Sequence, residues 1–170
     1  MTENINRKHE AALYHQSKGR SIIPAGPDKI PLIKWKEYET VIPSIEQINQ
    51  WWSIFPNANP AMVTGPLSKL VVLDLDAKHK RSSKEFDLPA TACAKSGNGG
   101  EHFYFNHPGK RVVKETAIFG LGVDMQGDNG LIILPPSVND VRGTYEWIVP
   151  LEDGVADMPE WLSDIVIDEK

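Results

Sequence analysis

One stretch decides the fold of this chain: Leu70-Val71-Val72-Leu73-Asp74-Leu75-Asp76, an apolar run that carries two aspartates two positions apart. A strand places alternate side chains on opposite faces, so Asp74 and Asp76 are expected on one face, about 7 Å apart. Two carboxylates at that spacing can lean toward a divalent cation, and oxygen ligands of this kind suit Mg²⁺ or Mn²⁺. A strand that simply ends in a polar turn has the same pattern, so the interpretation depends on the rest of the chain.

Two later stretches supply matching groups. Residues 97–105 read Gly-Asn-Gly-Gly-Glu-His-Phe-Tyr-Phe, a glycine turn that runs into a strand with His102 at its start. The glycines let backbone amides approach an anion closely, and an imidazole beside them can donate to phosphate oxygens. Gly122-Val123-Asp124 then puts a third acid at the end of another apolar stretch. Three acids and a histidine, each near the end of its own predicted strand, indicate one site.

The composition is that of one soluble globular domain over residues 1–170, with an acidic helix or tail at residues 151–170. The chain is 41% hydrophobic and 24% charged, which is ordinary for a soluble fold. No apolar run approaches the roughly 20 residues that span a bilayer, and the N-terminus lacks the pattern of a signal peptide. The single Cys93 excludes an internal disulfide framework. We therefore expect a cytoplasmic protein with no membrane partner.

The charges are unevenly distributed along the chain. Residues 1–120 hold 16 Lys and Arg against 12 Asp and Glu, whereas residues 121–170 hold 2 against 11. The net charge of −5 argues against a general polyanion binder. A nucleic-acid surface is therefore expected in the first two thirds of the chain, and the acidic end should face solvent or a partner.

Periodicity and turn residues predict the secondary structure. Helices are expected at residues 4–18, from the N-cap Ser44 onward, and at 159–165. Strands are expected at residues 21–24, 61–64, 70–76, 90–96, 102–106, 131–134 and 143–149, with an extended basic segment at 29–36. Two hairpins are predicted, one joining 61–64 to 70–76 and one at the turn Gly127-Asp128-Asn129-Gly130.

Several residues allow both a structural and a functional interpretation. At least one of Trp51 and Trp52 is expected to be a core anchor rather than part of a base-stacking platform, because their helix needs a buried face. Asp128 is better explained as a turn residue than as a ligand. The basic residues Lys78, Lys80 and Arg81 follow the aspartates, where a polyphosphate or template strand would pass, although a solvated loop explains them equally well.

Taken in order, these pieces resemble a known family. The matching segments are Lys-Ile-Pro-Leu-Ile-Lys-Trp (29–35), Trp-Trp-Ser-Ile-Phe-Pro-Asn-Ala-Asn (51–59), the stretch 62–76, Ser-Gly-Asn-Gly-Gly-Glu-His-Phe-Tyr-Phe (96–105), Gly-Val-Asp-Met-Gln-Gly-Asp (122–128), and Pro-Pro-Ser-Val (135–138) followed by Gly-Thr-Tyr-Glu-Trp (143–147). Together they are similar to the N-terminal domain of bifunctional DNA primase/polymerases, the prim-pol group of the archaeo-eukaryotic primase superfamily. The resemblance covers about residues 20–150.

The resemblance implies an α/β (α+β) fold, in which an RRM-like mixed or antiparallel sheet forms the catalytic core and an N-terminal α/β module is added. It implies a DNA primase or polymerase that joins dNTPs or NTPs to a primer on a single-stranded DNA template in plasmid or phage replication, with a fused or separate replicative helicase as partner. By position, Asp74, Asp76 and Asp124 match the catalytic acids that hold one or two Mg²⁺ or Mn²⁺ ions. His102 matches the histidine that contacts the nucleotide's phosphates, with Gly99, Gly100, Lys34, Lys95 and Ser137 completing the expected nucleotide-binding set.

This chain departs from the family pattern at one position, and other function classes stay open. Many members have serine two residues before the histidine, where this chain has Gly100, so backbone amides would replace a hydroxyl. A metal-dependent phosphohydrolase of the Asp-x-Asp kind usually has Thr or Val soon after the acids, and Ala77-Lys78 does not supply it. A non-catalytic single-strand-binding module would keep the basic loops and aromatic residues but would not need three acids at strand ends.

Overall fold

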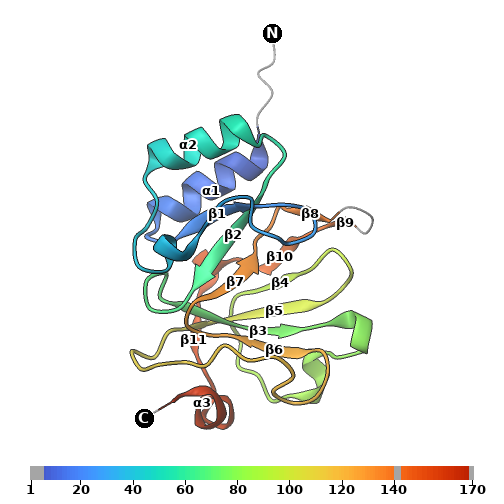
Figure 1. Ribbon diagram of the computed structural model, residues 1–170. Coiled ribbons are helices and arrows are strands. Elements are labelled where there is room, and N and C mark those ends of the chain that lie inside the picture. Colours follow the sequence, from blue (N-terminus) through green and yellow to red (C-terminus); the bar gives the residue numbers. More distant parts are fainter. Residues whose placement is uncertain (1–5, 140–142, 169–170) are drawn as a thin grey trace.

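The computed structural model describes residues 6–139 and 143–168, which form helices at two ends and sheets between them (Figure 1). Helices α1 (Arg7–Ser17) and α2 (Ile45–Ile54) lie at one end, and α3 (Glu160–Val166) lies at the other. The first sheet is antiparallel, in the order β1 (Ile22–Ala25), β2 (Asn59–Thr64), β7 (Gly130–Ile133). This mixture of helices and antiparallel sheets confirms the expected α+β fold.

The second sheet contains the apolar stretch 70–75 with its aspartate, as strand β3. Its order is β10 (Glu146–Val149), β4 (Cys93–Lys95), β5 (Glu101–Asn106), β3 (Leu70–Leu75), β6 (Val123–Gln126), with neighbouring strands antiparallel. Strand β11 (Ala156–Asp157) runs parallel to the end of β5, and β8 (Val138–Asn139) pairs separately with β9 (Gly143–Thr144). The sequence predicted a strand on each side of the glycine turn at 97–100, and β4 and β5 are paired there.

Helices α1 and α2, which accompany the first sheet, each begin after a residue whose side chain caps the helix. Asn6 caps α1, and Gly19, with φ +83°, follows its last turn. The expected start of this helix at residue 4 lies outside the described residues. Ser44 caps α2 as predicted, because its hydroxyl accepts a hydrogen bond from the Gln47 amide (3.1 Å). Trp51 and Trp52 are buried in the core, which confirms their structural interpretation.

Alternation along β3 decides what each face of the second sheet contacts. Val71, Leu73 and Leu75 pack on the side of α3, in one hydrophobic cluster with Leu162 and Val166. On the other face, Val72 belongs to the core shared with the first sheet and its helices. The same face continues beyond Val72 to Asp74, so the polar row begins where the packing between the two sheets ends.

The two predicted hairpins, one joining 61–64 to 70–76 and one at the turn 127–130, are wrong, although one bridge links Gly65 to Leu70. Strand β2 pairs with β1 and β7, whereas β3 pairs with β5 and β6, so the two strands lie in different sheets. Gly65, with φ +123°, lies at the point where the chain leaves the first sheet for the second. The turn at 127–130 likewise joins β6 in one sheet to β7 in the other, and the Thr64 hydroxyl donates to the Gly127 carbonyl (2.6 Å).

The basic segment at residues 29–36 is not a strand. Its pairing is limited to one bridge between Pro31 and Ala25, and a 3₁₀ helix begins at Lys36. Lys29 has φ +71°, which is incompatible with extended backbone, and proline cannot donate a ladder hydrogen bond. Trp35 packs against the core beneath this segment.

Among the described residues, no helix combines the length and the apolar character that crossing a lipid bilayer requires.

Candidate active site

Strand pairing brings three of the expected site residues side by side. In the sheet register, Asp74 of β3 stands opposite His102 of β5 on one side and opposite Asp124 of β6 on the other. Directly opposed residues of antiparallel strands have Cβ atoms about 4.5–5.5 Å apart and point to the same face. The row Asp74, His102 and Asp124 is therefore built from segments up to 50 residues apart in sequence.

Within this row, the side chains of His102 and Asp74 contact each other directly. The distance from His102 Nε2 to Asp74 Oδ1 is 3.4 Å, and the imidazole is buried. Burial by itself would raise the pKa of Asp74, but the charge and hydrogen bond of His102, together with the charge of Lys29, outweigh it and lower the pKa. Asp74 is therefore ionised at neutral pH. Within the described part of the chain, His102 Nδ1 has no hydrogen-bond partner.

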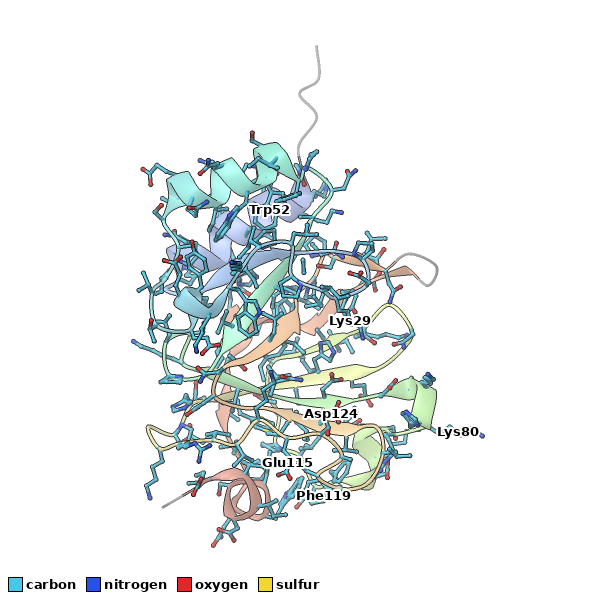
Figure 2. The ribbon with its side chains drawn as sticks, in the orientation of Figure 1. Lys29, Trp52, Lys80, Glu115, Phe119 and Asp124 are labelled. Carbon is cyan, nitrogen blue, oxygen red and sulfur yellow. The ribbon has the colours of Figure 1, made fainter. Side chains whose placement is uncertain are left out.

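Asp124 is oriented by the loop that precedes it. The Ala117 amide donates a hydrogen bond to Asp124 Oδ1 at 2.9 Å. This contact fixes one carboxylate oxygen while the side chain remains partly open to solvent. Figure 2 shows Asp124 on the second sheet, with Lys29 above it on the side of the first sheet.

The row opens into a cavity of about 300 Å³ between the two sheets. Basic and neutral polar groups join the acids there: Lys29 from the turn after β1, Lys114 from the loop before β6, and Gln126 from β6. Tyr145 completes one wall, and burial, together with the charge of Asp74, raises its pKa to about 12, so its hydroxyl keeps its proton. Such a mixture of fixed charges suits a ligand that carries both anionic groups and a cation.

A larger groove of about 640 Å³ lies on the other side of Tyr145, between α1 and β10. Its charged residues are Arg7 and Glu10 of α1 and Glu152, and Glu152 is already bonded to the Tyr14 hydroxyl. The smaller cavity is therefore the better candidate for the active site, because charged groups converge on it from both sheets.

Asp76 does not line the cavity. Its amide donates to the Gly122 carbonyl (2.7 Å), so its backbone continues the pairing of β3 with β6 and keeps it on the face of Asp74. Its carboxylate, however, caps the 3₁₀ helix Ala77–His79 by accepting a hydrogen bond from the Lys78 amide (2.9 Å). His79 Nε2 lies 4.0 Å from the other oxygen.

The glycine turn beside His102 is already hydrogen-bonded internally. The Gly99 amide donates to the Ser96 carbonyl (3.0 Å), and the Gly100 amide donates to the Ser96 hydroxyl (2.8 Å). A Cβ on Gly100 would lie 2.7 Å from that hydroxyl and 2.8 Å from the Leu75 carbonyl oxygen. Close packing against β3 and Ser96 therefore leaves no room for a side chain at position 100. Lys95, one position before Ser96, is exposed.

Two other expected nucleotide-binding residues lie outside the cavity lining. Lys34 is exposed on the segment between β1 and α2, whereas Lys29 of the same segment reaches the cavity. Ser137 is fully buried beside Tyr145, whose amide donates to the Ser137 carbonyl (2.8 Å). The Ser137 hydroxyl has no hydrogen-bond partner among residues 6–139 and 143–168.

Comparison with known protein families decides the identity of the fold. A family model, described as bifunctional DNA primase/polymerase, N-terminal, matches residues 11–161. The chain belongs to the Prim-Pol family. Among curated proteins, no sequence match reaches significance. The Prim-Pol match spans both sheets and all the residues of the cavity, so the cavity lies within the family domain.

Some residues of the Prim-Pol cavity could not have been found by sequence reasoning. Lys29 lies in a turn, and only the packing of the first sheet over the second brings it to Asp74. Gln126 could have been found, because strand alternation places it on the face of Asp124. Tyr145 follows the buried Ser137 segment and carried no signal beyond its aromatic type.

The carboxylates of the cavity fit a small donor set for a divalent cation. Across residues 6–139 and 143–168, no group of three or more His, Cys, Asp or Glu side chains is arranged to hold a metal ion. Mg²⁺ on phosphate substrates, however, is usually held by one or two carboxylates, with phosphate oxygens and water completing its shell. Asp74 and Asp124, opposed on adjacent strands and open to the same cavity, fit that smaller set.

Proposed function

We propose that this chain is a template-directed DNA primase/polymerase that joins nucleoside triphosphates to the 3′-hydroxyl of a primer on single-stranded DNA. The observation that carries the proposal is the row in which Asp74 is flanked by Asp124 and His102, at the base of a cavity lined by two lysines. Family membership makes DNA and nucleotides the expected substrates. The mixed charges that line the cavity support a triphosphate with its counter-ions as the ligand.

In this proposal Asp74 and Asp124 hold Mg²⁺ or Mn²⁺, and Asp76 is a further ligand. The bound metal supplies a lowered pKa for the attacking hydroxyl and charge stabilisation at the phosphates. The acids therefore act as ligands rather than as proton carriers. Asp76 joins them once its carboxylate releases the hydrogen bond that it accepts from the Lys78 amide. Its backbone already continues β3 on the face of Asp74.

His102, Lys29 and Lys114 orient the triphosphate. An imidazole and two ammonium groups can donate charge-assisted hydrogen bonds to phosphate oxygens. The ion pair of His102 with Asp74 fixes the ring at the boundary between metal ligands and phosphate. Lys34, Lys95, Ser137 and the amides of Gly99 and Gly100 remain proposed contacts of the wider nucleotide and template path.

Family membership alone supports the biological setting that we propose. It is the replication of plasmid or phage DNA in the cytoplasm, with a replicative helicase, fused or separate, as partner. The residues of the cavity support the proposed chemistry but say nothing about this biological setting.

Primer extension with labelled nucleotides tests the function. We expect Asp74→Ala and Asp124→Ala to lose at least about a hundredfold in rate, because metal ligation contributes several kcal/mol and each 1.4 kcal/mol is tenfold. The same loss is expected for Asp76→Ala. Asp87→Ala removes an exposed acid outside the cavity and serves as control.

Incorporation at the wild-type rate in Asp74→Ala, with thermal unfolding unchanged, would refute the assignment. Template binding by the wild type without incorporation would instead favour a single-strand-binding module. Release of inorganic phosphate without primer extension would favour a phosphohydrolase.

A further inference from the structure

The segment that follows β3 ties together the ends of the site strands. We name residues 77–86 the strap; it contains two short 3₁₀ helices, Ala77–His79 and Ser83–Glu85. Sequence reasoning offered Arg81 of the strap as a contact for a polyphosphate or template strand. The structure instead turns its guanidinium inward, with only 18% of the side chain exposed.

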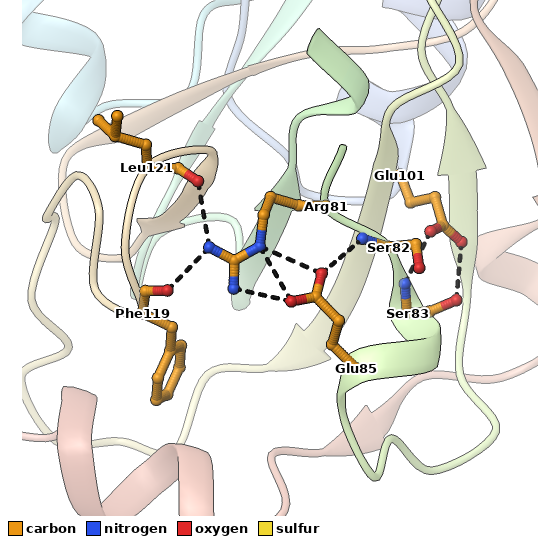
Figure 3. Close-up of polar contacts among 7 residues, drawn as sticks. All are labelled: Arg81, Ser82, Ser83, Glu85, Glu101, Phe119 and Leu121. Carbon is orange, nitrogen blue, oxygen red and sulfur yellow. Dashed lines mark hydrogen bonds and ion pairs between the residues drawn. The ribbon is translucent and has the colours of Figure 1, made fainter. Parts of the chain in front are cut away.

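Arg81 binds the loop that leads to Asp124 (Figure 3). Its Nη1 donates to the Phe119 carbonyl at 2.9 Å and to the Leu121 carbonyl at 3.1 Å. Its Nε donates to both carboxylate oxygens of Glu85, each at 3.1 Å, and Nη2 lies 3.0 Å from Glu85 Oε1. Glu85 is itself held by the Ser82 amide (2.9 Å). The planar guanidinium thus binds two carbonyls and one carboxylate at once. The compact ammonium group of a lysine lacks this fixed fork of donors.

The loop held by Arg81 orients the Asp124 carboxylate. The Ile118 amide donates to the Val123 carbonyl (2.9 Å), which closes the loop. The preceding residue, Ala117, donates to Asp124 Oδ1 (2.9 Å). The strap packs tightly here, because a Cβ on Gly122 would lie 2.6 Å from His79 Cβ and 2.9 Å from Arg81 Cγ. A shift of the loop relative to the strap would therefore move the hydrogen bond that orients Asp124.

The strap makes a second tie, to the strand on the other side of β3. The amide and hydroxyl of Ser83 donate to the two carboxylate oxygens of Glu101, at 2.9 and 3.0 Å (Figure 3). Glu101 immediately precedes His102 in β5. One short segment therefore connects the ends of the strands that carry Asp74, His102 and Asp124.

We propose that Arg81 is a positioning residue that sets the place of Asp124 relative to Asp74, and thereby the affinity of this pair for a divalent cation. The catalytic consequence of this positioning rests on the proposed function. The positioning of Asp124 by Arg81 does not depend on it. Arg81 acts through the 117–123 loop and does not contact substrate.

The fold should survive the loss of Arg81. Phe119 is also held by an aromatic cluster with Phe86 and Trp161, whose ring centroids lie 5.5–5.6 Å apart. Removing the guanidinium therefore loosens the carbonyls of the loop without removing its anchor in the core.

The test compares Arg81→Ala, Arg81→Lys and Glu85→Gln with the control Lys84→Ala, which removes an exposed lysine of the same strap. The first readout is amide hydrogen exchange at Ala117 and Ile118 in metal-free protein. The second is direct Mn²⁺ binding, measured by electron paramagnetic resonance of free Mn²⁺. The third is the Mn²⁺ concentration that gives half-maximal primer extension.

We expect Arg81→Ala to speed exchange at Ala117 and weaken Mn²⁺ binding about tenfold, the lower end of the effect of residues that orient metal ligands. Arg81→Lys should be intermediate and Lys84→Ala unchanged. Wild-type exchange at Ala117, or wild-type Mn²⁺ affinity, in Arg81→Ala overturns the inference. If exchange rises uniformly across the protein, the milder Glu85→Gln decides by the same criteria. A wild-type protein that shows these ties but extends no primer overturns the proposed function instead.

Discussion

His102 lies between Asp74 and the ring of Tyr145, whose centroid is 6.0 Å away. Because we propose that it donates to the nucleotide's phosphates, we expect His102→Ala to raise the KM for the incoming nucleotide more than it lowers kcat. One hydrogen bond to a charged group contributes about 1.5–3 kcal/mol, so the KM should rise about ten- to a hundredfold. Steady-state primer extension at varied nucleotide concentration measures both constants. His107→Ala, which changes a turn histidine bonded to Asp128, should leave KM unchanged.

His15 carries a pH dependence of stability that is separate from the site. Burial and the charge of Arg20, whose Nη1 lies 2.8 Å from His15 Nδ1, lower the pKa of His15 to about 4. The unfolded chain takes up this proton near pH 6.5, but the folded protein does so only near pH 4. The contribution of neutral His15 to the free energy of unfolding is therefore fully present above about pH 6.5. It is lost as the pH falls toward 4, by up to about 1.4 kcal/mol per pH unit.

Urea unfolding at pH 7, 5.5 and 4.5 measures this loss. His15→Asn keeps an acceptor for Arg20 but cannot titrate, so its stability should fall less over the same range. An equal pH slope in the variant and the wild type would show that other groups carry the dependence.

At the scale of elements, α2 depends on its N-terminal cap. The Ser44 hydroxyl satisfies the Gln47 amide, one of the donors that a helix start leaves unpaired. We expect Ser44→Ala to lower the free energy of unfolding by about 1 kcal/mol. Chemical denaturation followed by circular dichroism provides the value. The control Ser53→Ala, an exposed serine within the same helix, should change stability by less than about 0.5 kcal/mol.

At the scale of the whole molecule, the cavity exists because the first sheet covers part of the second. Lys29 follows β1 of the first sheet, and Asp74 lies on β3 of the second sheet. The charge of Lys29 contributes to the lowered pKa of Asp74. We expect Lys29→Ala to raise the nucleotide KM about tenfold, the value of one lost charge-assisted contact. Lys34→Ala, on the same segment but outside the cavity, should raise the nucleotide KM less than Lys29→Ala does. The reverse order of effects would mean that the triphosphate lies toward Lys34.

The sequence carried the local information well. Strand alternation along residues 70–76, the glycine turn before His102 and the apolar approach to Asp124 were all visible as patterns of adjacent residues. Each pattern depends on neighbours within a few positions, because periodicity and turn chemistry are properties of the local backbone. The structure duly places Asp74, His102 and Asp124 on one face.

By itself the sequence determined the capped helix at Ser44, the strands on either side of the turn at 97–100 and the gathering of Asp74, Asp124 and His102 at one site. Its family resemblance determined the α+β class. Only the tertiary structure decided that β2 and β3 belong to different sheets, that Lys29 rather than Lys34 reaches the cavity, that the Asp76 carboxylate caps its own turn and that Arg81 faces inward. The reason is that a strand's ladder partner and a charged side chain's neighbours are set by competition among distant segments for burial and hydrogen bonds. A turn motif reports where the chain can reverse, but not which sheet will take up the next strand.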